Sequence, residues 1–183
     1  MHTWSQRRLP ITVICVTDGE AACPEISDLA LIRRQELTCA LRELGATRAR
    51  VVRLQIADGN VAKYESALTD AICRPLLPHS ILAAPFELDG HPDHDAAGRA
   101  ALVAARRRDA ECVRFPIWSW HQETPNLRSQ PDARRFALNV HALEAKQRAM
   151  SQFRSQLTDR PGGAIVPAHV LEYFSRPYEV FLL

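Results

Sequence analysis

The chain has 183 residues, of which 46% are hydrophobic and 24% charged, and its formal net charge at pH 7 is +2. This length predicts a single domain over residues 1–183 that is large enough to bury a core. The small net charge gives no basis for binding nucleic acid or an anionic membrane, and no apolar run approaches the roughly 18 residues of a membrane span. Five cysteines without a Cys-x-x-Cys pair argue against a disulfide framework and favour a reducing, cytoplasmic location.

The first part of the chain alternates apolar runs with amphipathic ones. Residues 9–16 are apolar and β-branched, which predicts a strand buried on both faces that ends at the polar turn 17–20. A helix is expected over 27–44, a second strand over 49–56, and a short helix over 61–72.

A polar stretch follows the third predicted strand, at 80–86. It reads Asp-Gly-His-Pro-Asp-His-Asp over residues 89–95 and precedes an alanine-rich run, 96–107, that predicts a helix. Pro92 suits the first turn of that helix, where a missing N–H costs nothing. A strand that ends in polar residues at a helix start is where open α/β sheets bind ligands.

The remaining elements are shorter. We expect a strand over 112–120, near a sheet edge or bulged because it contains Pro116, and then a surface loop over 123–132. The pattern next predicts a strand at 136–140, an amphipathic helix at 142–157, a short helix at 167–174 and a last strand at 178–183. Alternating strands and helices predict an α/β fold with a mostly parallel, Rossmann-like sheet covered by helices on both faces.

His91 and His94 are the candidate functional pair. Their spacing of three places two side chains on one face of a helix, so we expect both imidazoles together at the carboxyl edge of the sheet. The same residues also suit a simple turn with a helix cap, and that interpretation stays open at this point.

The order His-Pro-Asp-His, followed by Ala-Ala-Gly-Arg, resembles the second signature of the LmbE-like (PIG-L) zinc deacetylases. That family removes an acetyl group from N-acetylglucosaminyl substrates. The resemblance implies that His94 is a metal ligand for zinc (Zn²⁺). It also implies that His91 lies near the developing oxyanion as a catalytic group, and that Asp93 is the carboxylate that orients it.

The resemblance extends over nearly the whole chain. Arg33, in an Arg-x-x-Glu pattern, and Asp58, in Ala-Asp-Gly, match family positions that face the sugar, and Trp118 lies in a matching Phe-Pro-Ile-Trp run. These three residues are the substrate-binding candidates that the resemblance implies.

The family's first signature, Ala-His-Pro-Asp-Asp-Glu, does not occur in this sequence. Relative to the family, the chain therefore looks truncated at its N-terminus, with the first strand missing and with two zinc ligands and the catalytic base absent. Other ligand-type side chains are available in number, although Asp18 and Glu20 suit a turn and a helix start better than a metal site. They are Asp18, Glu20, Asp89, Asp95 and His121.

Three hypotheses follow. The first is a zinc-dependent N-deacetylase acting on a small amino-sugar conjugate through an incomplete metal site. The second is a metal-free module that binds a sugar or nucleotide, and the third is an ordinary α/β domain whose His-Pro-Asp-His is a turn and cap. A missing neighbour would leave strand 9–16 with a bare edge, so we expect low stability or a homo-oligomer, together with weak zinc binding.

Overall fold

A computed structural model describes residues 1–121, 130–158 and 163–183. Its strands are β1 (Thr12–Cys15), β2 (Arg50–Arg53), β3 (Ile81–Pro85), β4 (Glu111–Phe115), β5 (Ala133–Ala137) and β6 (Tyr178–Leu182). Its α-helices are α1 (His2–Gln6), α2 (Leu29–Glu43), α3 (Glu65–Cys73), α4 (Pro92–Arg108), α5 (Val140–Met150), α6 (Arg154–Leu157) and α7 (Ala168–Phe174). The described residues also form three 3-10 turns: η1 (Glu20–Ala22), η2 (Val61–Tyr64) and η3 (Trp118–His121).

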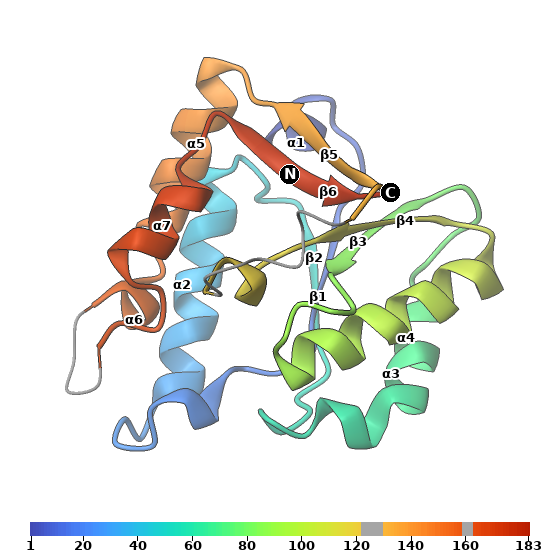
Figure 1. Cartoon of the computed structure of the whole chain (residues 1–183), viewed down its shortest axis with the longest axis horizontal. Helices are drawn as coiled ribbons and strands as arrows, with labels where there is room; N and C mark the ends of the chain where they lie inside the picture. The colour runs from blue at the N-terminus through green and yellow to red at the C-terminus, as the bar shows by residue number, and fades with distance from the viewer. Residues whose placement is uncertain (122–129, 159–162) are drawn as a thin grey trace.

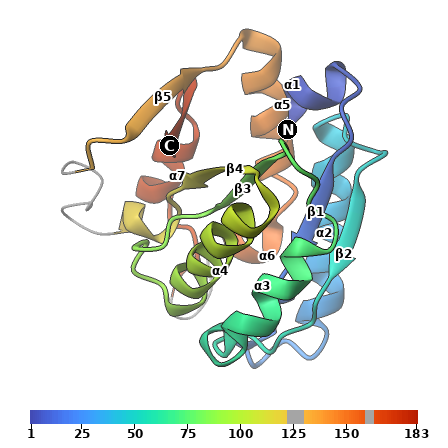
Figure 2. The same ribbon diagram turned by 90° about the vertical axis from the view of Figure 1, so that its right-hand side faces the viewer.

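The helices form two layers with the strands between them (Figures 1 and 2). Helices α3 and α4 cover one side, and α2, α5, α6 and α7 lie on the other. This arrangement confirms the α/β class expected from the alternating pattern. None of the described helices is both long and apolar enough to cross a membrane.

Several element boundaries differ from the sequence prediction. The strand expected over 112–120 ends at Phe115, because Pro116 follows it and residues from Trp118 onward form η3. It is also an interior strand, since β4 lies between β3 and β6. The helix expected over 142–157 is divided into α5 and α6, and α1 has no apolar periodicity that would have predicted it. Most of the loop expected over 123–132 lies outside the described residues.

The strands among the described residues form two sheets rather than the single sheet that was expected. Strands β1 and β2 pair in parallel, and a second sheet has the order β3-β4-β6-β5. Within the second sheet β3 and β4 are parallel, but β6 runs antiparallel to both β4 and β5. The parallel prediction rested on the regular alternation of strand and helix, which ends after β4. Strand β6, which runs against its two neighbours, comes later in the chain.

Strand β1 is less buried than its apolar sequence predicts. Thr12 is exposed and Val13 to Cys15 are partly exposed, while Leu9, just before the strand, is 50% exposed. The expectation of burial on both faces was therefore wrong. Of its side chains, Ile14 packs against the core cluster only as a partly buried residue, and among the described strands β1 pairs with β2 alone.

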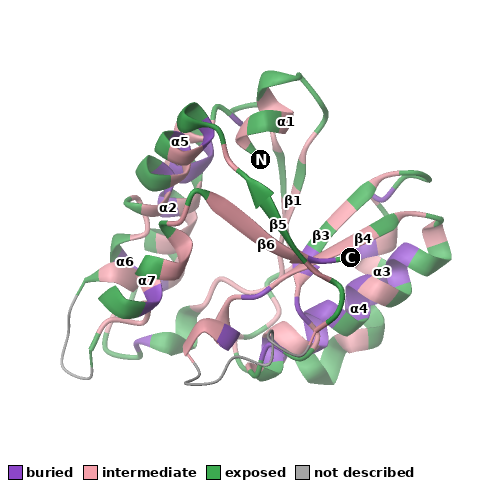
Figure 3. Cartoon of the chain, turned by 45° about the horizontal axis from the view of Figure 1, so that its top comes forward, coloured by how far each residue is buried: buried purple, intermediate pink, exposed green. Residues whose placement is uncertain are grey.

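Helix α4 packs very closely on β3, and Figure 3 shows buried residues along it. Its buried face consists of Gly98 and small alanines, and several of these join one core cluster with α3 and β3. A Cβ atom on Gly98 would lie 2.6 Å from the carbonyl oxygen of Pro85 and 2.8 Å from the Cα of Glu87. This close contact fixes the start of α4 just beyond the end of β3.

Candidate functional site

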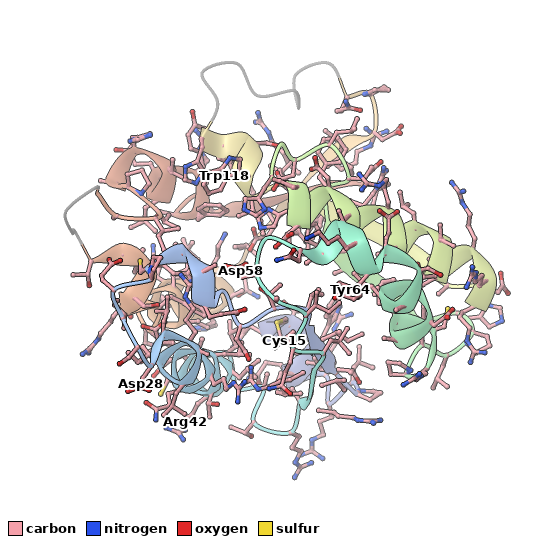
Figure 4. All side chains as sticks on the ribbon, turned by 90° about the horizontal axis from the view of Figure 1, so that it is seen from below. Cys15, Asp28, Arg42, Asp58, Tyr64 and Trp118 are labelled. Atoms are coloured by element: carbon pink, nitrogen blue, oxygen red, sulfur yellow. The ribbon has the colours of Figure 1, made fainter. Side chains whose placement is uncertain are left out.

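The loops that follow β1 and β2 are bonded to each other. The Glu20 carboxylate accepts the backbone N–H of Asp58 at 2.9 Å, and the Asp58 carboxylate accepts the N–H of Ala21 at 3.2 Å. Figure 4 looks onto this edge of the fold and labels Asp58 and Trp118. Asp58 therefore lies at the carboxyl end of β2, as expected, and its side chain contacts the loop that follows β1.

Asp93, in the first turn of α4, connects these loops to the second sheet. One oxygen of its buried carboxylate accepts the N–H of Gly59 at 2.6 Å, and the other accepts the N–H of Val61 at 3.1 Å. Both oxygens are thus engaged by the loop after β2, whereas the sequence had suggested that this carboxylate orients His91. In the structure Asp93 ties α4 to the β1–β2 half of the molecule.

His91 and His94 lie side by side at the start of α4. His91 is the N-cap residue in an extended conformation, and its Nδ1 accepts the N–H of Asp93 at 3.3 Å. His94 is one turn further on, and the two ring centroids are 4.5 Å apart. Neither ring is sealed in the core, because both residues are partly exposed. The predicted proximity of the two imidazoles is confirmed.

Asp89 lies beneath His94 and is 0% exposed. Its Oδ2 is 2.6 Å from Nδ1 of His94. Burial alone would raise the pKa of Asp89, but the hydrogen bonds from His94 and from the backbone of Ser119, Trp118 and Ile117 outweigh burial and lower this pKa to about 2. The carboxylate is therefore ionised at neutral pH.

Trp118, in η3, forms an aromatic wall beside the histidines. Its ring makes an edge contact with His91, with centroids 5.3 Å apart, and stacks on His121 at 4.3 Å. Burial lowers the pKa of His121, and nearby His169 and His94 lower it further against the opposing effect of Asp89. Residue spacing did not indicate that His121 lies near the two imidazoles. Its ring reaches Trp118 because residues 118–121 form the 3-10 turn η3.

Arg33 is anchored on the turn after β1. Its Nη1 donates to the carbonyl oxygen of Gly19 at 2.6 Å. Gly19 adopts a φ of +68°, which favours glycine, and a Cβ there would come within 1.8 Å of Nη1 of Arg33, so a larger residue would make this guanidinium move. Arg33 and Asp58 thus border the same turn at the strand ends.

The Arg-x-x-Glu pattern that contains Arg33 also makes a helix contact away from the imidazoles, through its Glu36. The buried carboxylate of Glu36, from the Arg-x-x-Glu pattern, accepts the N–H of Ser155 at 2.6 Å and its hydroxyl at 2.7 Å. This pair holds α6 against α2. Glu36 therefore serves in helix packing.

The donor set does not fit the three-ligand site that catalytic zinc normally needs. Within residues 1–121, 130–158 and 163–183, no group of three or more His, Cys, Asp or Glu side chains could hold a metal ion. The carboxylates considered as substitute ligands have other partners: Asp18 is paired with Arg34 and Arg53, and Glu20 accepts the Asp58 N–H. His94, with Nδ1 on Asp89, has its Nε2 left for a ligand.

Comparisons with solved structures identify the fold. The A40926 pseudoaglycone deacetylase Dbv21 superposes with a TM-score of 0.68 at 20% identity, over 99% of this chain and 88% of that one. The conserved protein TT1542 from Thermus thermophilus gives 0.65 at 21% identity, over 100% of this chain and 86% of that one. A deacetylase triple mutant from the teicoplanin biosynthetic pathway gives 0.66 at 18% identity, over 85% and 74% of the two chains.

Comparison with curated protein sequences finds no match. A comparison with family models does find one, over residues 1–105, to the family described as PIG-L: GlcNAc-PI de-N-acetylase. The match covers more than half of the chain and includes His91, Asp93 and His94. The chain belongs to the PIG-L family.

Proposed function

We propose that the chain binds an N-acetylated amino sugar at the carboxyl edge of its strands and takes part in removing the acetyl group. Membership of a de-N-acetylase family supports the reaction class. The pseudoaglycone deacetylase Dbv21 shares the fold over 99% of this chain, which supports the use of the same scaffold for this reaction. All five cysteines are free thiols, which supports a reducing, cytoplasmic location.

The hydrogen bonding of His91 is the observation that carries the proposal. Because Nδ1 of His91 accepts the Asp93 N–H, the neutral imidazole has its proton on Nε2, and this N–H is a donor for a ligand. Amide hydrolysis develops negative charge on the carbonyl oxygen in the tetrahedral intermediate. One well-placed donor to that oxygen is worth about 3 kcal/mol of barrier.

Three further side chains suit recognition of the sugar. Trp118 offers an apolar ring next to His91, Asp58 offers acceptor oxygens for hydroxyls, and Arg33 offers a fork of donors. We propose that they hold the sugar while His91 contacts the acetamide carbonyl and His94 lies beside it.

Zinc supplies two functions to such a reaction: it acidifies a water molecule and it polarises the carbonyl. His94 is the side chain that we propose as a ligand. Because the described residues do not provide a three-ligand set around His94, we assign no step of the reaction to a metal.

A second candidate function is a metal-free sugar-binding module. The observation that favours it is the state of the carboxylates near the imidazoles. Both oxygens of Asp93 accept backbone N–H groups, and Asp89 is buried beneath His94, so neither is placed as a free general base.

The decisive experiment measures binding and acetate release on the same protein. We expect N-acetylglucosamine to raise the melting temperature more than glucosamine does, and an N-acetylglucosaminyl conjugate to release acetate. His91→Ala should lower the release rate about 100-fold, because the oxyanion loses its donor. His141→Ala, at an exposed histidine on α5, is the matched control and should change neither quantity. Binding without acetate release would favour the second candidate, and the absence of both would contradict both.

A further inference from the structure

Asp89 is a buried carboxylate that accepts hydrogen bonds from residues 117–119 and also contacts the ring of His94. Its Oδ1 accepts the N–H of Ile117 at 2.9 Å, the N–H of Ser119 at 2.9 Å and the Ser119 hydroxyl at 2.8 Å. Its Oδ2 accepts the N–H of Trp118 at 2.7 Å and contacts Nδ1 of His94 at 2.6 Å. Two carboxylate oxygens offer about four acceptor sites, so this group has no capacity to spare.

The contact with His94 determines which nitrogen of that ring carries the proton. An ionised carboxylate can only accept, so Nδ1 of His94 must donate, and the neutral ring has its lone pair on Nε2. His91 has the opposite arrangement, because its Nδ1 accepts the Asp93 N–H. Two rings 4.5 Å apart thus differ in function: His91 offers a donor at Nε2 and His94 an acceptor.

The contact with the turn determines where Trp118 lies. Three successive backbone N–H groups, from Ile117 to Ser119, converge on the one carboxylate and define the path of the chain into η3. That turn carries the ring that lies 5.3 Å from His91 and stacks on His121. Asp89 therefore holds the turn that follows β4 against the loop that follows β3.

We propose that Asp89 is a positioning residue of this site, which fixes His94 as its Nδ1–H tautomer and at the same time holds the turn that carries Trp118. The proposal rests on the proposed function for its consequence in catalysis, but not for its geometry. The carboxylate contacts no ligand itself. It acts through the imidazole on one side and the indole on the other.

The direct test is the tautomer of His94, read from long-range ¹H–¹⁵N correlation spectra at about pH 8, where imidazoles are mostly neutral. In the unmodified protein we expect the proton on Nδ1 of His94 and on Nε2 of His91. In Asp89→Asn an amide N–H₂ can face the ring, so His94 should change to its Nε2–H form while His91 keeps its own. A folded Asp89→Asn protein whose His94 keeps the Nδ1–H form would overturn the proposal.

Two matched variants separate this role from general support of the fold. Asp95→Asn changes a carboxylate in the first turn of α4 that accepts the Gly90 N–H, and it should leave both tautomers unchanged. Ser119→Ala removes the hydroxyl from the turn but not the contact with His94. It should alter the Trp118 fluorescence without altering the His94 tautomer. If Asp89→Asn does not fold, the spectra of the unmodified protein and of Ser119→Ala still decide, because an Nε2–H His94 in either would overturn the proposal.

Kinetics on an N-acetylglucosaminyl conjugate provide the second readout. Asp89→Asn should lower kcat about 10- to 100-fold, which is the range typical of groups that orient a metal-ligating histidine. Ser119→Ala should raise KM and leave kcat nearly unchanged. If the unmodified protein shows the expected tautomers but neither binds nor hydrolyses the conjugate, the proposed function fails while the positioning role stands. If it hydrolyses the conjugate and Asp89→Asn changes neither tautomer nor kcat, the positioning role fails alone.

Discussion

The β1–β2 sheet and the β3-β4-β6-β5 sheet end at the same group of loops but differ in how well they are covered. No residue of β1 or β2 is fully buried, whereas Ala84 in β3 and Leu182 in β6 are, and so is Phe86 just after β3. Helix α4 packs against β3 closely enough that Gly98 has no room for a side chain. The half that carries the imidazoles is thus the more fully buried half, and the half that carries Arg33 and Asp58 is joined to it by Asp93 and by partly buried side chains such as Ile14 and Leu54.

This difference shows that an apolar sequence alone does not ensure that a strand is buried. Residues 9–16 are as apolar as 80–86, and β1 and β3 each pair with one strand only among those described, yet only β3 has a fully buried residue, because helix α4 packs directly on it. Some side chains of β1 still reach the shared core, since Ile14 packs against the cluster beneath α3 and α4. A strand edge of this kind is open to pairing with another chain.

The largest effect should come from paired truncations in the two halves. Phe86→Ala, at a side chain 1% exposed, should lower the free energy of unfolding by about 3–5 kcal/mol. Ile14→Ala should cost less than about 2 kcal/mol, because this side chain is only partly buried. Urea denaturation of both variants checks the difference. Equal losses would show that the β1–β2 half is as tightly packed as the other.

Removing the connection between the halves should have the next largest effect. Asp93→Ala leaves the N–H groups of Gly59 and Val61 without their acceptor, which should cost about 1–3 kcal/mol. Hydrogen exchange should speed up at Gly59 and Val61 and in β2, but not in β4. If exchange in β4 rises equally, Asp93 supports the whole fold and does not specifically join its halves.

Lowering the pH should remove a stabilising carboxylate contribution from each sheet's half of the molecule, Asp18 in one and Asp89 in the other. The pKa of Asp89 falls from an ordinary value of 3.8 to about 2, so its contribution to stability is complete above pH 3.8 and is lost as the pH falls through 2. Hydrogen bonding and charge from Arg34 and Arg53 also lower the pKa of Asp18, after β1, and its contribution is lost in the same direction. We expect unfolding free energy to fall between about pH 4 and pH 2. Asp89→Asn should show a smaller fall, and an unchanged pH profile in that variant would contradict the assignment to Asp89.

Much of the fold followed from local pattern, and much of the site did not. The strand at 80–86, the helix after Pro92 and the proximity of His91 to His94 depend on neighbours in the sequence, and the structure confirms them. The backbone N–H partners of Asp89 and Asp93 lie about 30 residues away in the chain, so spacing could not reveal them. The division into two sheets also depends on strand pairing, which a hydrophobic pattern does not encode.

The smallest effect on stability is expected at the open edge of β1. In a parallel pair, alternate residues of a strand bond to its neighbour. The Ile11 carbonyl accepts the Arg50 N–H and the Cys15 carbonyl accepts the Leu54 N–H, so the backbone groups of Thr12, between them, face away from β2. Thr12→Lys adds a charge at an exposed position, and it should reduce self-association while leaving the melting temperature nearly unchanged. Thr3→Lys on α1 is the control, and light scattering over a range of concentrations is the measurement. Equal behaviour of the two variants would exclude association through this edge.

Thermal melting with and without one equivalent of zinc, alongside sizing, tests the central claim that this chain presents an imidazole pair without a complete metal site. The described residues offer His94 as a ligand but no group of three, so added zinc should raise the melting temperature by only a degree or two at most, on the order expected for a weakly bound ligand. His94→Ala should remove even that small gain. A monomer that gains many degrees from stoichiometric zinc would contradict the account, because it would require a closed ligand set around His94.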